Sequence, residues 1–156
     1  MINIKTIEDV FAKSIYAKSI AIKSLKLEKR QHARIMESIS DDIRKYTDLI
    51  KPMASIKAKK QANKIGIILE ENGWHDQKKF DLHRKDFQLD HVILVKDVRE
   101  SCLNSKDEEE IKYILINKTK VAWILFEENK KLSELGYGRN RPDPADAYKE
   151  AGIILE

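Results

Sequence analysis

Two residues whose types could do chemistry stand next to each other inside the longest apolar run of the sequence. They are Asp90 and His91, within the stretch FQLDHVILVK at residues 87–96. A charged side chain in apolar surroundings costs free energy unless it has a partner, so the pair is expected to bind or react with something. A neutral imidazole near pH 7 can accept a proton from water, which makes His91 a candidate general base. The structural alternative is a backbone partner for His91 and, for Asp90, an N-terminal cap or a salt bridge with Arg84 or Lys85.

The elements that must position this pair are a predicted strand, a second strand and a helix. Residues 89–95 are rich in Val, Ile and Leu and are typical of a buried strand. Residues 120–126 (KVAWILF) are the second strand candidate. Residues 127–135 then predict a short helix, which Gly136 closes.

A loop and two short helices are expected between these elements and after them. Residues 96–105 should be a loop, and a capping box that starts at Ser105 predicts a short acidic helix over residues 106–116. The turn-rich tail should end in a brief helix. Within that tail, Arg139 and Arg141 are candidates to contact phosphate.

The order of strand, strand and helix, with an Asp-His pair on the first strand and Asn129 on the helix, resembles the HNH nucleases over residues 87–135. Those enzymes have a ββα-metal core with Asp-His at the end of one strand, an Asn or His on the helix, and another Asn between them. The resemblance implies a metal-dependent endonuclease that hydrolyses phosphodiester bonds in nucleic acid. The expected fold is α+β, with a helical N-terminal half followed by a small ββα-metal-like unit.

The resemblance also implies a role for each matching residue. His91 would be the general base, and Asn117 or a backbone carbonyl would fix its tautomer. Asp90 and Asn129 would be oxygen ligands for Mg²⁺ or Mn²⁺, with Glu128 as the alternative to Asn129.

The front half of the chain predicts helices. Residues 7–36 contain neither Gly nor Pro and are typical of one helix. From Met36 to Met53 the apolar residues are spaced three and four apart, which predicts a single apolar stripe on a helix that Pro52 should end. The stripe either packs within the chain or joins a second copy or a partner protein.

A further helix is expected from Ala54 or Ser55 to a C-terminal cap at Gly73. Its charged side holds the densest basic cluster of the chain, made of Lys57, Lys59, Lys60 and Lys64. These lysines are candidates to bind the phosphates of nucleic acid, and an ordinary solvated helix face is the alternative.

Charge and composition predict two regions. Residues 1–73 carry 15 Lys or Arg and 9 Asp or Glu, whereas residues 74–156 carry 15 and 17. A boundary between a basic helical region and an α+β region is therefore expected at Trp74, where aromatic residues and histidines begin. Basic surface attracts polyanions, so nucleic acid, with DNA as the expected form, is the predicted partner.

Composition also excludes several classes of protein. The single cysteine, Cys102, allows neither a disulfide framework nor a zinc site built from cysteine pairs. No stretch is long enough to span a membrane and the start lacks a signal-peptide pattern, so no membrane partner and a cytoplasmic location are expected. A Gly-rich phosphate loop and a Ser-His-Asp spacing are both missing, which argues against nucleotide hydrolysis and acyl transfer.

Two functions from different classes stay open. The first is the HNH-type endonuclease, in which the carboxyl half cuts and the basic helices bind the duplex or a partner protein. The alternative is a non-enzymatic nucleic-acid- or protein-binding protein, or a helical assembly subunit, in which Asp90 and His91 are structural. The endonuclease requires Asp90, His91 and either Asn129 or Glu128 to converge on one gap the size of a metal ion.

Overall fold

The computed structural model describes residues 4–156 and has an α+β fold. The chain forms two compact units, each assembled from two separate stretches of sequence. Unit 1 joins residues 4–47 to Val95–Thr119, and unit 2 joins Asp48–Leu94 to Lys120–Glu156. Each unit therefore contains residues from both sides of the boundary expected at Trp74.

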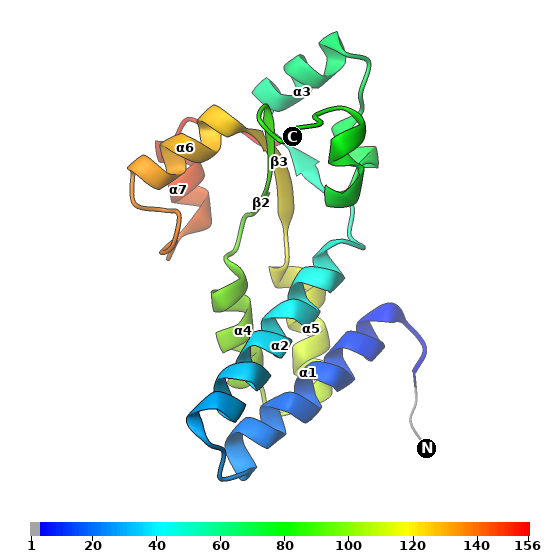
Figure 1. Ribbon diagram of the computed structural model, residues 1–156, viewed down its shortest axis with the longest axis vertical. Helices are drawn as coiled ribbons and strands as arrows, with labels where there is room; N and C mark the ends of the chain where they lie inside the picture. The colour runs from blue at the N-terminus through cyan, green and yellow to red at the C-terminus, as the bar shows by residue number, and fades with distance from the viewer. Residues whose placement is uncertain (1–3) are drawn as a thin grey trace. The chain divides into compact units, whose positions relative to one another are not determined.

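The regular secondary structure of unit 1, within its described residues, consists of helices (Figure 1). Its elements are α1 (Ile7–Ser24), α2 (Lys29–Thr47), α4 (Val95–Leu103) and α5 (Glu108–Lys118). In this unit α1 packs against α2 and α5, and α4 packs against the same two helices.

Unit 2 contains the sheet and the helices that cover it. Its elements are β1 (Met53–Ala54), α3 (Ile56–Lys64), η1 (Leu69–Glu71), η2 (Trp74–Lys79), β2 (Phe87–His91), β3 (Val121–Leu125), α6 (Phe126–Glu134) and α7 (Pro144–Glu150). The η elements are short 3₁₀ helices. No helix of residues 4–156 combines the length and the apolar character that crossing a membrane requires.

The single helix predicted over residues 7–36 is wrong, because a turn at residues 25–28 separates α1 from α2. Polar contacts hold the two helices side by side. Lys18 and Ser14 both donate to Asp42, at 2.5 and 2.7 Å. No Gly or Pro marks the turn in the sequence, so the packing of the two helices against each other overrides the local helix propensity there.

The apolar stripe predicted from Met36 lies in the core of unit 1 along α2. Ile39, Ile43 and Tyr46 are 0%, 1% and 3% exposed. Met53, the last residue of the predicted stripe, lies beyond the end of α2 and belongs to β1. These three side chains therefore pack within the chain.

The loop predicted over residues 96–105 is wrong, because Val95–Leu103 forms α4. Val98 and Cys102, which are four residues apart and share one side of the helix, are 2% and 0% exposed. Burial of this side against α2 and α5 stabilises a helix whose local sequence signals are weak.

The acidic helix predicted over residues 106–116 is present as α5, but its predicted cap is wrong. Asp107 and not Ser105 is the N-cap residue, since its side chain accepts a hydrogen bond from the Glu110 N–H at 2.9 Å. The three glutamates that follow Asp107 lie in the first turn, where negative charge is favourable.

The sheet of unit 2 has the order β1-β3-β2, with β1 as a short third strand beside the two that were predicted. β3 confirms the strand predicted over residues 120–126, whereas β2 coincides with the strand predicted over residues 89–95 only at residues 89–91, because the chain leaves the sheet after His91 and α4 begins at Val95. β1 is parallel to β3, and β2 is antiparallel to it, with Asp90 opposite Ala122 and His91 opposite Val121. The end of the chain lies along β1, where the Glu156 N–H donates to the Ala54 carbonyl at 3.1 Å.

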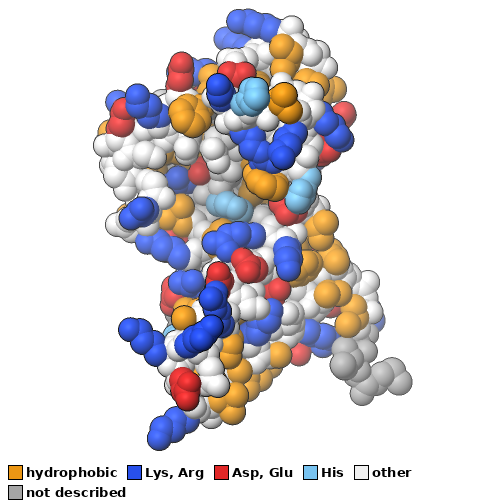
Figure 2. Space-filling view, viewed as in Figure 1, with side chains coloured by type: hydrophobic (Ala, Val, Ile, Leu, Met, Phe, Trp, Pro, Cys, Tyr) orange, Lys and Arg blue, Asp and Glu red, His pale blue; other side chains and the backbone are white. Residues whose placement is uncertain are grey.

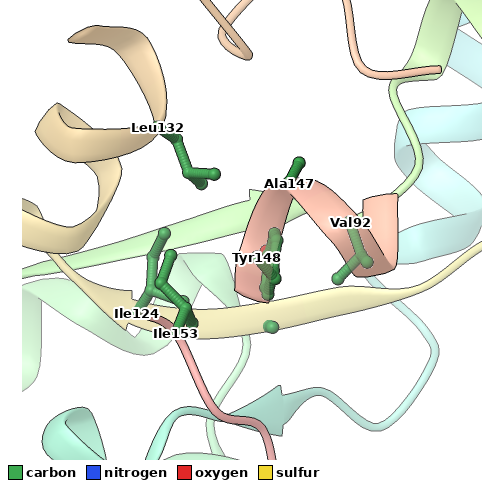
Figure 3. Packing of buried hydrophobic residues seen from close by; sticks show 7 residues of the cluster. Val92, Ile124, Leu132, Ala147, Tyr148 and Ile153 are labelled. Carbon is green, nitrogen blue, oxygen red and sulfur yellow. The ribbon is translucent and has the colours of Figure 1, made fainter. Parts of the chain in front are cut away.

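Successive side chains of a strand point to opposite faces, so the sheet of unit 2 has two separate apolar layers. Helices α6 and α7 cover the first face, where the cluster consists of Val92, Ala122, Ile124, Leu132, Ala147, Tyr148 and Ile153 (Figure 3). α3 and η1 cover the second face, where the cluster consists of Ala54, Ala58, Ala62, Leu69, Phe87 and Trp123. These layers hold β2, α3 and α6, the elements that carry the candidate side chains of unit 2.

The helix predicted to run from Ser55 to Gly73 is shorter than expected. It begins where predicted, with Ser55 as its N-cap, but α3 ends at Lys64, and Gly66 follows with φ of +73°. The Ile67 N–H then donates to the Ala62 carbonyl at 3.0 Å, which closes the helix end around the left-handed glycine. The cap expected at Gly73 is therefore wrong.

Candidate functional site

Asp90, on β2, is fixed by two donors from the C-terminal part of the chain. Its side chain is 12% exposed. Arg141 Nη1 donates to Oδ2 at 2.7 Å, and the Tyr148 hydroxyl donates to the same oxygen at 2.5 Å. Burial and the Asp90 charge raise the pKa of Tyr148 far above its ordinary value of 10.0, so the hydroxyl keeps its proton. The salt bridge expected with Arg84 or Lys85 is formed with Arg141 instead.

Arg141 joins the segment before α7 to the end of β2. Its side chain is 1% exposed, and besides Asp90 it donates to the carbonyls of His91 and Val92 at 3.0 and 3.1 Å. Its Nε donates to the Tyr137 carbonyl at 3.2 Å. Because this guanidinium is buried and surrounded by acceptors, the expectation that Arg141 contacts phosphate is wrong.

His91 follows Asp90 directly in β2, so its side chain points to the other face of the sheet. Asp90 lies on the face covered by α6 and α7, where Tyr148 contacts it. His91 lies on the face of Leu89 and Phe87, which pack with the cluster around Trp123. The two side chains that the sequence makes neighbours are therefore separated by the sheet.

Glu128, the alternative metal ligand, is buried in α6 at 5% exposure. Its Oε2 accepts from the Ser55 hydroxyl at 2.6 Å and from the Leu125 N–H at 2.9 Å. Its Oε1 is buried and makes no hydrogen bond among the described residues. Glu128 therefore caps its own helix and connects α6 to the start of α3.

The two candidate asparagines lie in different units. Asn129 is half-buried on α6 of unit 2, directly after Glu128. Asn117 is exposed on α5 of unit 1, where its side chain donates to the Tyr113 carbonyl at 2.9 Å. The roles of His91, Asn117 and Asn129 in catalysis or metal binding stay predictions.

The surroundings of Asp90 do not fit the Mg²⁺ or Mn²⁺ that the resemblance implies. A divalent cation on Oδ2 would meet the positive charge of Arg141, whose nitrogen already lies at 2.7 Å. Residues 4–156 bring no three His, Cys, Asp or Glu side chains together in a group that could hold a metal ion.

The four lysines predicted to bind nucleic acid lie on α3, where Ala58 and Ala62 form the buried side. Lys57, Lys60 and Lys64 are spaced three and four residues apart, so they share one exposed side of the helix. None of these three forms an ion pair within the described part of the chain.

Lys59, the fourth lysine of α3, lies on a different side of the helix from the other three. It forms an ion pair with Glu70 at 2.5 Å. Partial burial acts to raise the pKa of Glu70, but the bond from Lys59 and the charges of Lys59 and Lys51 hold it below its ordinary value. The surroundings of α3 are thus positive enough to keep this carboxylate ionised.

The two covers of the unit 2 sheet carry opposite charge. Residues 51–85, which contain α3, η1 and η2, have nine Lys or Arg and four Asp or Glu, a net charge of +5. Residues 126–156, which contain α6 and α7, have five and seven, a net charge of −2. In Figure 2, blue side chains stand at the top of the view, where Figure 1 draws α3, and on the surface below it. We call this cover, residues 51–85, the basic side of unit 2.

Sequence reasoning missed two features of unit 2. Arg141 and Tyr148 lie 51 and 58 residues from Asp90, so no local pattern indicates that they bind it. The second is the stacking of Arg84 on Trp74, with the guanidinium carbon 3.7 Å from the ring centroid. The only sequence signal for it was the change of composition at Trp74.

Comparison of the chain with protein-family models, with curated proteins and with solved structures finds no match.

Proposed function

We propose that this chain binds nucleic acid through the basic side of unit 2 and needs no metal ion to do so. The observation that carries the proposal is the charge difference across one sheet, +5 over residues 51–85 against −2 over residues 126–156. A surface with one sign of charge attracts a polyanion regardless of its sequence, through release of counterions. Asp90 has a structural role in this proposal.

The geometry of α3 supports contact with consecutive phosphates. Lys57 and Lys64 are seven residues apart, and a helix rises about 1.5 Å per residue, so the lysine side spans about 10 Å. One DNA strand carries a phosphate about every 3.4 Å along the axis, so three lysines match the length of a few phosphates. Ser55 and Glu128 fix the start of this helix against the sheet.

The proposal is tested by fluorescence anisotropy with a labelled DNA oligonucleotide, at low salt and with EDTA present. The triple variant Lys57→Gln, Lys60→Gln, Lys64→Gln should bind at least about tenfold more weakly than wild type, because each lost phosphate contact removes counterion release. The matched control is Lys130→Gln, Lys131→Gln, Lys149→Gln, which removes three exposed lysines from the acidic cover. Equal affinity of both triple variants, or no binding by the wild type, would overturn the proposal.

Endonuclease activity of the HNH type stays a prediction with its own test. Plasmid nicking is measured for wild type and His91→Ala with Mg²⁺ or Mn²⁺ and with a chelator. Metal-dependent nicking that the variant lacks would make His91 a catalytic base. DNA binding in the chelator without nicking in either metal is the result that binding alone predicts.

A further inference from the structure

Trp74, the first residue of η2, differs sharply in exposure from the other tryptophan of the chain. It is 45% exposed, whereas Trp123 is 0% exposed in the core of unit 2. Aromatic rings on a positive surface are the groups on which proteins stack unpaired nucleic-acid bases. Trp74 belongs to the basic side of unit 2, so its surroundings decide whether it can act in this way.

Arg84 fixes the orientation of the indole. Its guanidinium carbon lies over one face of the ring, 3.7 Å from the centroid, so a base could stack only on the opposite face. Its Nη2 and Nη1 donate to the Trp74 carbonyl at 3.3 Å and to Gln77 Oε1 at 3.1 Å. Arg84 has φ of +53°, a left-handed conformation that residues with a side chain rarely adopt. Such a conformation persists only where surrounding contacts hold it.

Asp81 supplies those contacts from the start of the same loop. This carboxylate is 5% exposed and accepts from the N–H groups of Lys85, Asp86 and Phe87 at 3.0, 3.1 and 3.1 Å. Burial opposes its ionisation, but these hydrogen bonds hold the pKa of Asp81 below its ordinary value of 3.8. The loop that carries Arg84 is therefore ordered before any ligand arrives.

The stretch of chain that carries the ring has a net positive charge, and the acidic group beside it from outside that stretch is Asp48, which lies 3.5 Å from the imidazole of His75. Residues 74–85 contain four basic and two acidic side chains. Of the two acids, Asp81 is buried and Asp76 is paired with Lys79 at 2.7 Å. The exposed basic side chains of this stretch are Lys78, Lys79 and Lys85.

We propose that Trp74, held by Arg84, is a stacking platform for an unpaired base, so that the basic side of unit 2 prefers single-stranded nucleic acid to a duplex. This inference rests on the proposed function and names the form of its ligand. Each base of a duplex is covered by its neighbours, so the indole adds affinity only where a strand is unpaired. The lysines attract both forms.

The test compares a 12-nucleotide thymidine oligomer with a 12-base-pair duplex by anisotropy, with EDTA present. Trp74→Ala should weaken binding of the oligomer roughly 5- to 100-fold and leave duplex binding within about twofold. Trp74→Phe, which keeps an aromatic face, should retain most of the affinity for the oligomer. Tyr113→Ala is the matched control, since it removes an aromatic residue of 61% exposure from unit 1.

Tryptophan fluorescence is an independent readout on the unmodified protein. Stacking should quench the emission of Trp74 when the thymidine oligomer is added, while the buried Trp123 provides a constant background. The inference is overturned if Trp74→Ala binds the oligomer as wild type does, or if it weakens both ligands equally. If the wild type binds neither the oligomer nor the duplex, the proposed function is overturned together with this inference. Binding of the duplex by the wild type therefore tests the proposed function separately.

Discussion

At the scale of single residues, the Asp90 carboxylate is part of a buried network in unit 2. Arg141, with a side chain that is 1% exposed, neutralises it, and Tyr148 donates a second hydrogen bond to it. A buried guanidinium left without its carboxylate is far more costly than either group exposed to water. The pair thus connects the segment before α7 to β2, and removing it should lower the free energy of unfolding.

Asp90→Asn should lower the free energy of unfolding by about 3–5 kcal/mol, because Arg141 would keep its charge in a buried site without a counter-charge. Urea denaturation at neutral pH measures this. Glu127→Gln, an exposed change on α6, is the control and should stay within about 0.5 kcal/mol of wild type. An Asp90→Asn protein as stable as the control would show that the ion pair does not hold unit 2 together.

Asp81 should make the stability of unit 2 depend on pH in the acid range. Its pKa in the folded protein lies below the ordinary 3.8, so its contribution is complete above pH 3.8 and is lost as the pH falls below that value towards the folded pKa. Asp81→Asn should cost about 1–3 kcal/mol of unfolding free energy at pH 7, because buried N–H groups lose an acceptor.

The difference between wild type and Asp81→Asn should shrink in urea denaturation as the pH is lowered from 7 to below 3.8. Asp86→Asn, an exposed neighbour, serves as the control for general acid effects. A difference that stays constant with pH would contradict the role assigned to the Asp81 carboxylate.

At the scale of elements, the start of α3 depends on one hydroxyl. Ser55 is 0% exposed, accepts from the Ala58 N–H at 3.1 Å and donates to Glu128 at 2.6 Å. The residue therefore caps the helix that presents the lysines and also fixes it to α6. Both contacts use the same side-chain oxygen.

Ser55→Ala should lower the free energy of unfolding by about 2 kcal/mol or more. It removes the N-cap of α3 and also the hydroxyl that donates to the buried Oε2 of Glu128. The measurement is a urea midpoint. Ser133→Ala, at an exposed position of α6, is the control, and it should change stability by less than about 0.5 kcal/mol. Equal midpoints for the two variants would contradict the account.

The sequence predicted those elements whose own residues determine them. β3 and α7 carry an apolar run and local caps, the start of α3 near Ser55 was predicted, and β2 coincides with its predicted strand at residues 89–91. The turn at residues 25–28 and the helix α4 were not predicted, because packing between helices of unit 1 determines both.

The candidate site was predictable from the sequence only in part. Helical spacing alone indicates that Lys57, Lys60 and Lys64 share a side of α3. Strand alternation separates Asp90 from His91, but the partner of Asp90 lies 51 residues away and depends on the fold of the tail. Local patterns therefore identified the basic helix, and only the tertiary structure identified the role of Asp90.

At the scale of the whole molecule, the two covers of the unit 2 sheet carry opposite charges, and the proposed binding of nucleic acid depends on this difference. A net charge of +5 over residues 51–85 makes attraction to a polyanion the expected property of that side. Such attraction has a thermodynamic signature, since the binding constant falls linearly with salt concentration on a logarithmic scale.

The salt dependence of DNA binding shows whether the positive charge of residues 51–85 attracts the nucleic acid. Affinity is measured by anisotropy between about 50 and 200 mM salt in EDTA, for wild type and for the variant with Gln at positions 57, 60 and 64. The account predicts a linear plot for wild type and a slope that is smaller in magnitude by about 2–3 in the variant, since each lost phosphate contact removes about 0.7–0.9. A wild-type affinity that does not change with salt, or one that requires a metal ion, would contradict it.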